Sequence, residues 1–153
     1  DDCRMQVSVP GMTERCDHDV MFGGDLFDPL DRLGEPTTWG KPAPWCDYSG
    51  PVPDKGVRGI TIFDTPGNLR YPTSWHVRAY GLMGANCFGW KYFGEKDYNK
   101  PLLPAPTGDY DMKKGEKLTF KYRVYVHSGD VKEAGVADRY AVYTKPPAVS
   151  WVE

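Results

Sequence analysis

The densest group of chemically versatile side chains in this 153-residue chain lies in residues 71–89. Within that stretch, His76, Arg78 and Tyr80 alternate along a segment, residues 75–83, that reads as a β-strand. Side chains two residues apart point to the same face of a strand, so these three should share one face. Histidine exchanges protons near neutral pH, and arginine can clamp a carboxylate through two hydrogen bonds. The pattern predicts a site with His76 as acid–base group and Arg78 as substrate clamp.

Other residues have the side-chain types that bind sugars. Sugars present apolar C–H faces that stack on aromatic rings, and hydroxyl groups that hydrogen-bond to polar side chains. The candidate binding residues are Trp45, Asp47, Tyr71, Trp75, Tyr80 and Asn86. Trp45, Tyr71 and Trp75 would form the stacking platform. We therefore expect a carbohydrate ligand, and a uronate or another acid would suit Arg78 equally well.

The clearest strand in the sequence is residues 117–127, where apolar and polar side chains alternate strictly. Its predicted buried face consists of Leu118, Phe120, Tyr122, Val124 and Val126. Arg123 and His127 lie on the opposite face and are further candidates for contact with the ligand. The alternative is that this opposite face is simply solvated.

The remaining pattern is that of a mainly β protein. Strands are expected at residues 5–9, 57–63 and 90–93, a turn at 64–68, and long loops at 23–56 and 94–115, which are rich in Pro and Gly. A capping box formed by Asp130 and Glu133 predicts a short helix that extends to about Tyr143. The sequence thus predicts an antiparallel β-sandwich with long loops and one short C-terminal helix. It divides into an N-terminal segment (1–22), a β domain (23–147) and a tail (148–153).

Composition excludes several classes of function. The formal net charge is −2, and no basic run is longer than Lys113-Lys114, so nucleic acid is not an expected partner. No apolar run is long enough to span a bilayer. The chain is expected to be soluble, in the periplasm or secreted if a signal peptide has been removed, and otherwise in the cytoplasm. Cys3 and Cys16 could form a disulfide, or all four cysteines could be free with Cys87 buried.

Motifs for common catalytic chemistry are absent from the sequence. It contains no GxSxG, HExxH, GxGxxG or phosphate-binding GxxxxGK motif. His76 and His127, with Asp47 or Asp64, could form a metal site if their strands were neighbours, which would make a metal-dependent oxidase or hydrolase an alternative. No metal or cofactor is assigned.

Seven segments, in this order and spacing, carry a family resemblance: 39–41 (WGK), 45–50 (WCDYSG), 59–64 (GITIFD), 68–73 (NLRYPT), 75–82 (WHVRAYGL), 85–89 (ANCFG) and 118–129 (LTFKYRVYVHSG). They resemble the C-terminal half of a bacterial family labelled "methane oxygenase PmoA-like", a domain of uncharacterised function. The resemblance implies part of a supersandwich like that of galactose mutarotase, and sugar binding or sugar conversion.

The resemblance also implies an incomplete site. The N-terminal half of that family, with its pair of histidines, has no counterpart in residues 1–22, and Ala79 and Cys87 replace residues that are usually Asp and Pro in it. Half of a sandwich would expose strand edges and an apolar sheet face. An alternative function is therefore that of a non-catalytic module that associates with a partner or with itself.

Overall fold

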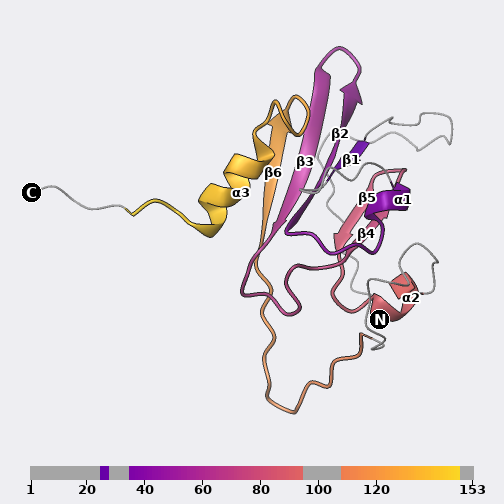
Figure 1. Ribbon diagram of the computed structural model, residues 1–153, viewed down its shortest axis with the longest axis vertical. Coiled ribbons are helices and arrows are strands. Elements are labelled where there is room, and N and C mark those ends of the chain that lie inside the picture. Colours follow the sequence, from indigo (N-terminus) through magenta and orange to yellow (C-terminus); the bar gives the residue numbers. More distant parts are fainter. Residues whose placement is uncertain (1–24, 28–34, 95–107, 149–153) are drawn as a thin grey trace, which may run out of the picture.

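A computed structural model describes residues 25–27, 35–94 and 108–148 of the chain. Figure 1 shows a four-stranded sheet with α3 at one side and a two-stranded hairpin with α1 and α2 at the other. The large sheet has the order β1 (Asp25–Phe27), β2 (Trp45–Val52), β3 (Gly56–Asp64) and β6 (Tyr122–Ser128), and every neighbouring pair is antiparallel. The hairpin consists of β4 (Trp75–Arg78) and β5 (Leu82–Ala85). The helices are α1 (Glu35–Thr38), α2 (Trp90–Gly94) and α3 (Val136–Thr144).

The predicted fold class is confirmed, since the protein is mainly β with two antiparallel sheets and a short C-terminal helix. The strand predicted at 57–63 is β3, which extends one residue further at each end. The strand predicted at 5–9, Cys3 and Cys16 lie outside the described residues, as do 95–107 of the predicted loop and 149–153 of the tail. Cys87 is buried with a free thiol, as is Cys46. Burial raises the pKa of the Cys87 thiol, because a thiolate would lose its contact with water, and the nearby Arg70 charge opposes that rise.

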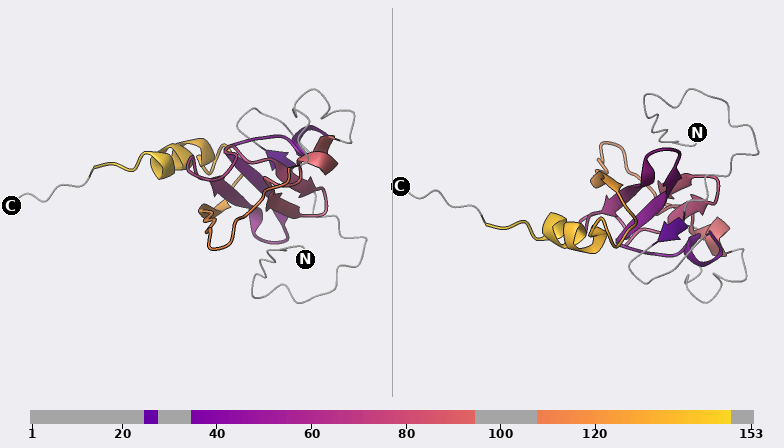
Figure 2. Two further views of the ribbon diagram at one scale, coloured as in Figure 1. Left: turned by 90° about the horizontal axis from the view of Figure 1, so that it is seen from below. Right: turned by 90° about the horizontal axis from the view of Figure 1, so that it is seen from above.

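The large sheet buries a separate cluster of side chains on each of its two faces. On one face, Trp45 and Phe63 pack against Val136 of α3. On the other, Cys46 and Ile62 pack with the hairpin, which contributes Trp75. Figure 2 shows α3 and the hairpin at opposite ends of the molecule. Each large apolar side chain buried in this way stabilises the fold by about 1.5–3 kcal/mol. Both α3 and the hairpin therefore stabilise the large sheet by packing on it.

The prediction that residues 23–56 are mostly loop is wrong for Trp45–Val52, which form β2, one of the two inner strands of the large sheet. Gly50 and Pro51 suggested a break, but Pro51 lies beyond the residues that pair with β1. The hydrogen bond from the Gly129 N–H to the Val57 carbonyl shows that Val57 faces β6. Its opposite residue on β2, Pro51, therefore directs its nitrogen away from β3, where no N–H is required.

The single strand predicted at 75–83 is a hairpin instead. Arg78 ends β4, and the chain turns through Ala79, Tyr80 and Gly81 before β5 begins at Leu82. Gly81 has a φ of 97°, which residues with a Cβ rarely adopt, and its N–H donates to the Arg78 carbonyl. Tyr80 therefore belongs to the turn and not to the strand face of His76 and Arg78.

Residues 90–93 form helix α2 and not the predicted strand. The N–H of Phe93 donates to the carbonyl of Gly89, which closes one helical turn. This turn buries the Phe93 ring edge-on against Trp39, with 5.0 Å between the ring centroids. The packing of Phe93 on Trp39 thus outweighs the preference of Trp, Tyr and Phe for β-strands.

Strand β6 begins later than predicted, at Tyr122, and its buried face is the opposite one. Val124 and Val126 are exposed, whereas His127 is buried and Tyr125 is half-buried. Tyr125 packs against the cluster under α3, and His127 forms a hydrogen bond with the buried Asp47 carboxylate. These partners, which no sequence period reveals, decide which face of β6 points inward.

The predicted capping box forms, but it does not begin the helix. The Asp130 Oδ1 atom accepts hydrogen bonds from the N–H groups of Lys132 and Glu133, and the Glu133 carboxylate accepts one from the Asp130 N–H. Gly135, with a φ of 60°, then redirects the chain, and α3 starts at Val136. The predicted helix is therefore a capped turn followed by a shorter helix.

Asp64, fully buried at the end of β3, organises the loop that leads to the hairpin. Its Oδ1 atom accepts hydrogen bonds from the Thr65 N–H at 2.9 Å and from Asn68 Nδ2 at 2.7 Å, and its Oδ2 atom accepts one from the Thr73 N–H at 2.8 Å. Asn68 in turn exchanges two hydrogen bonds with the Lys121 backbone, which fixes the start of β6. Burial raises the pKa of Asp64, and the three donors oppose that rise.

We expect Asp64→Asn to destabilise the protein by about 1–3 kcal/mol. Both carboxylate oxygens accept hydrogen bonds, so the NH₂ group of an asparagine would face an N–H donor whichever way its amide is turned. Urea unfolding would measure the change. Asp54→Asn is the matched control, since Asp54 is exposed and its φ of 60° suits asparagine. Equal stability of the two variants would contradict this role of Asp64.

Candidate functional site

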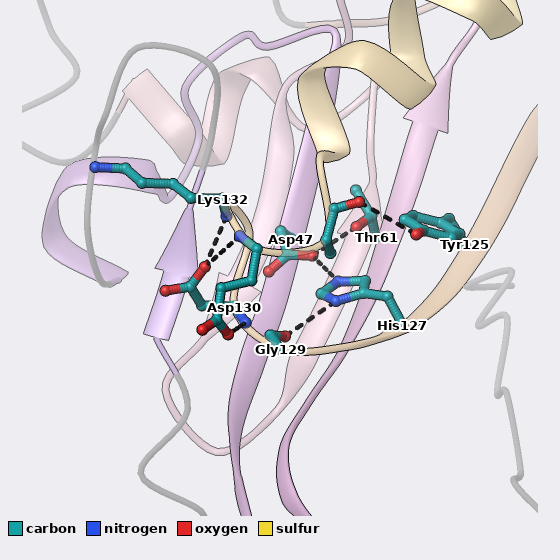
Figure 3. A network of polar contacts seen from close by, with 9 residues as sticks. Asp47, Thr61, Tyr125, His127, Gly129, Asp130 and Lys132 are labelled. Atoms are coloured by element: carbon teal, nitrogen blue, oxygen red, sulfur yellow. Dashed lines mark hydrogen bonds and ion pairs between the residues drawn. The ribbon is translucent and has the colours of Figure 1, made fainter.

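A buried polar network crosses three strands of the large sheet (Figure 3). Asp47 on β2 lies opposite Thr61 on β3, and Thr61 lies opposite Tyr125 on β6. His127, two residues beyond Tyr125, therefore falls on the same face, beside Gly59. The alternation of each strand brings these side chains together beneath the turn that precedes α3.

Asp47 and His127 form an ion pair when the imidazole is protonated. The His127 Nε2 and Asp47 Oδ2 atoms are 2.7 Å apart, and the side chains are 1% and 0% exposed. Thr61 Oγ1 donates a second hydrogen bond to the same Oδ2 atom. The other ring nitrogen, Nδ1, lies 3.1 Å from the Gly129 carbonyl oxygen. Both ring nitrogens thus face acceptors, and only the doubly protonated ring donates to both.

The arrangement differs from that of a catalytic triad. In a triad, the histidine lies between the hydroxyl and the carboxylate, so that it can remove the hydroxyl proton. Here the carboxylate of Asp47 lies between Thr61 and His127, so the imidazole is not placed to accept the proton of the Thr61 hydroxyl. All three side chains are also buried from solvent. The network is suited to fixing strand positions rather than to chemistry on a substrate.

One atom of this network is incompletely satisfied. Asp47 Oδ1 is buried and has no hydrogen-bond partner among the described residues. An unsatisfied buried oxygen costs free energy unless a water or another group pairs with it. Asp47 therefore depends on His127 and Thr61 for the compensation of its charge.

Gly59 makes room for the imidazole ring. A Cβ atom at this position would lie 2.2 Å from His127 Cε1 and 2.5 Å from Nε2. Such distances are far below van der Waals contact, so the ring lies directly over the glycine. A glycine inside a strand often marks this kind of close approach, so Gly59 is a feature of the sequence from which the network could have been suspected.

His76 and Arg78, the predicted catalytic residues, lie on the other side of the molecule. The His76 ring packs edge-on against Trp39 and Phe93, with 6.5 and 6.3 Å between centroids. The Arg78 guanidinium lies 5.1 Å from the centroid of the same Trp39 ring. The two residues thus share a strand face, as their spacing predicts, and both are half-buried.

The predicted stacking residues do not gather around His76 and Arg78. Trp45 and Trp75 are buried in separate clusters, and the Trp75 indole N–H donates to the Ala43 carbonyl at 2.8 Å. The Tyr71 hydroxyl lies 2.8 Å from that of Tyr140 on α3. Tyr80, at 78% exposure, is the predicted aromatic residue that presents its ring to solvent near Arg78.

The other predicted residues have local structural contacts. Asn86 accepts a hydrogen bond from the Phe88 N–H, which shapes the turn before α2. Arg123 lies 4.3 Å from the centroid of the Tyr143 ring on α3, a cation–π contact. The predicted pairs that the fold does bring together are therefore His76 with Arg78, and Asp47 with His127.

A joint metal site of His76 and His127 does not form. His76 belongs to the hairpin side and His127 to the α3 side of the large sheet, so the sheet separates them. Within the described ranges, no group of three or more His, Cys, Asp or Glu side chains is positioned to hold a metal ion.

Arg70 is a structural residue that the sequence pattern does not predict. Its guanidinium donates to the carbonyls of Cys87, Gly108 and Asp109 at 2.7–2.8 Å and stacks on Trp90 at 4.5 Å. It thereby holds residues 108–109 against the turn after the hairpin. No spacing or motif indicates this role, because its three acceptors are backbone carbonyls that depend on the fold.

Fold and network together define a mainly β domain that is built around a buried carboxylate–imidazole pair. The chain belongs to a family of unknown function, DUF6807, whose model matches residues 9–141. The resemblance to a PmoA-like family is therefore wrong: the matching model is that of DUF6807, and nothing indicates the other family. No curated protein and no solved structure matches the chain. No helix in the described part of the chain is long and apolar enough to cross a membrane.

We expect Gly59→Ala to destabilise the protein by about 1–3 kcal/mol, because the new methyl group must displace His127 from Asp47. Thermal unfolding of the purified variant would measure this. Gly67→Ala is the matched control, because a Cβ there meets nothing within 4 Å. A neutral effect of Gly59→Ala would show that the imidazole does not occupy this position.

We expect His127→Ala and Asp47→Ala each to cost about 3–5 kcal/mol, because each leaves the other group buried without its partner. The double variant should cost clearly less than the sum of the two, since it removes both members of one pair. A double-mutant cycle in urea would test this, and additive costs would contradict a direct interaction.

Proposed function

We propose that the protein binds a sugar, or a sugar acid such as a uronate, on the face of β4 that carries His76 and Arg78. The observation that supports this proposal is that both side chains lie against the one ring of Trp39. They are held in place by packing while they remain partly accessible. A preorganised arginine beside a histidine suits a ligand that has both a carboxylate and hydroxyl groups.

The hairpin turn beside this face provides an aromatic surface. The Tyr48 hydroxyl donates to the Ala79 carbonyl at 2.8 Å and so anchors the turn to the large sheet. The next residue, Tyr80, is largely exposed. An exposed aromatic ring on an anchored turn can stack on the apolar face of a sugar. In this proposal Tyr80 replaces Trp45 and Trp75, whose rings are buried.

Titration with neutral and acidic monosaccharides, followed by tryptophan fluorescence, would test the proposal. We expect saturable quenching by an acidic sugar and a roughly tenfold or greater loss of affinity in Arg78→Ala, because charge-assisted hydrogen bonds are lost. His76→Ala should also weaken binding. Arg58→Ala is the matched control, since Arg58, like Arg78, donates to the carbonyl of its preceding residue but is exposed on β3.

Two outcomes would contradict the sugar proposal. One is the absence of a fluorescence change with any sugar of the panel. The other is an equal loss of affinity in Arg58→Ala and Arg78→Ala, which would indicate a general charge effect rather than a site on β4.

A second candidate function is that of a module that associates through its large sheet. The observation that favours it is the exposure of two apolar side chains, Val124 and Val126, on the edge strand β6. Exposed apolar residues on a strand edge are typical of a surface that contacts another polypeptide.

A further inference from the structure

Strand β6 is the last strand of the large sheet, and no described residue pairs with its outer side. The register between β3 and β6 shows which backbone groups point outward. The Gly129 N–H donates to the Val57 carbonyl, so the backbone N–H and C=O groups of Gly129 point toward β3. Every second residue before Gly129 does the same, namely His127, Tyr125 and Arg123. The N–H and C=O groups of Tyr122, Val124, Val126 and Ser128 therefore point away from the sheet.

The outer side of β6 lacks the features that usually protect an edge. Proteins block such edges with proline, with lysine, or with a bulge. The pairing of β6 with β3 is regular from Tyr122 to Ser128, so no bulge interrupts it. The two central outward residues are valines, which are 50% and 69% exposed. This edge therefore combines available backbone hydrogen-bonding groups with apolar side chains.

The elements that follow β6 do not cover these valines. The turn after Ser128 carries Val131 and Ala134 onto the face of Trp45 and Phe63, where α3 also packs. Val124 and Val126 belong to the other face, because they alternate with Tyr125. Figure 2 shows α3 directed away from the hairpin side of the sheet.

We infer that β6 pairs antiparallel with β6 of a second copy of this chain, which joins two four-stranded sheets into one continuous sheet. The pairing that uses every outward backbone group places Val124 opposite Val126 of the second copy, and Tyr122 opposite Ser128. The valines of the two copies would then bury one another on one face. Because an antiparallel pair of identical strands is two-fold symmetric, the contact closes as a dimer.

Charge favours a second copy over an unrelated strand. From Glu116 to Arg123 the charged side chains are exposed and basic on balance, with Lys117, Lys121 and Arg123 against Glu116. The segment after the strand is acidic on balance, with Asp130 and Glu133 against Lys132. Antiparallel pairing brings the basic start of one strand beside the acidic end of the other at both ends of the contact, whereas parallel pairing would align like charges. The strand is therefore complementary to itself.

This dimer rests on the second candidate function, to which it gives a second copy as partner, and it does not depend on the proposed sugar site, which lies on the hairpin. The first test is light scattering after size exclusion, over a roughly hundredfold range of concentration. We expect wild type to change from monomer to dimer, and Val126→Lys to dissociate at least about tenfold more readily, because a charge replaces a buried methyl contact. Val142→Lys is the matched control, since Val142 on α3 is equally an exposed valine, at 54%.

Hydrogen exchange on the wild-type protein gives a test that requires no variant. The outward amides of Tyr122, Val124, Val126 and Ser128 should be protected at high concentration and exchange rapidly after dilution. Those of Arg123, Tyr125 and His127 should be protected at both concentrations, because they pair with β3.

Three results would overturn the inference. They are a wild-type protein that is monomeric over the whole range, a dimer that Val142→Lys weakens as much as Val126→Lys, and a dimer whose outward β6 amides exchange rapidly. The sugar titration should give the same affinity for Val126→Lys and wild type, so failure of one proposal leaves the other unaffected.

Discussion

The hydrogen-bonded pair of Asp47 and His127 is the constraint on which the arrangement of the large sheet depends. It joins β2 to β6 across β3, over a glycine that leaves room for the ring. A slip of one residue in either register would move one partner to the opposite face and leave the other buried alone. Buried pairs of this kind add little net stability, but breaking one is costly. The pair therefore acts chiefly by penalising alternative registers.

The orientation of His127 has consequences for the rest of β6. Once His127 and Tyr125 face inward, the turn at Gly129 and helix α3 cover that face, and the aromatic rings of α3 pack on Phe63. Val124 and Val126 then have to point outward. An apolar face that the sequence pattern predicts as core thus becomes available surface at a sheet edge. The same interaction that fixes the fold also creates the surface that we assign to a second copy.

The two regions that could serve function are separate in space and different in character. The network of Asp47, Thr61 and His127 is closed to solvent and has its carboxylate at the centre, so it holds strands. His76 and Arg78 are partly open and lie against Trp39, so they can meet a ligand. Membership of DUF6807 assigns no activity to either region. The sugar proposal therefore rests on the chemistry of the β4 face and the hairpin turn.

The sequence by itself determined the fold class, the position of β3, the capped turn at Asp130 and the common face of His76 and Arg78. All four depend on local rules, namely strand alternation, turn residues and side-chain capping. Only the tertiary structure decided that Trp90–Gly94 is a helix, that Trp45 and Trp75 are core, and which face of β6 is buried. Those outcomes depend on partners far away in the chain: Trp39 for Phe93, and Asp47 for His127. Alternation shows that a strand has two faces, but the covering elements decide which of them becomes the interior.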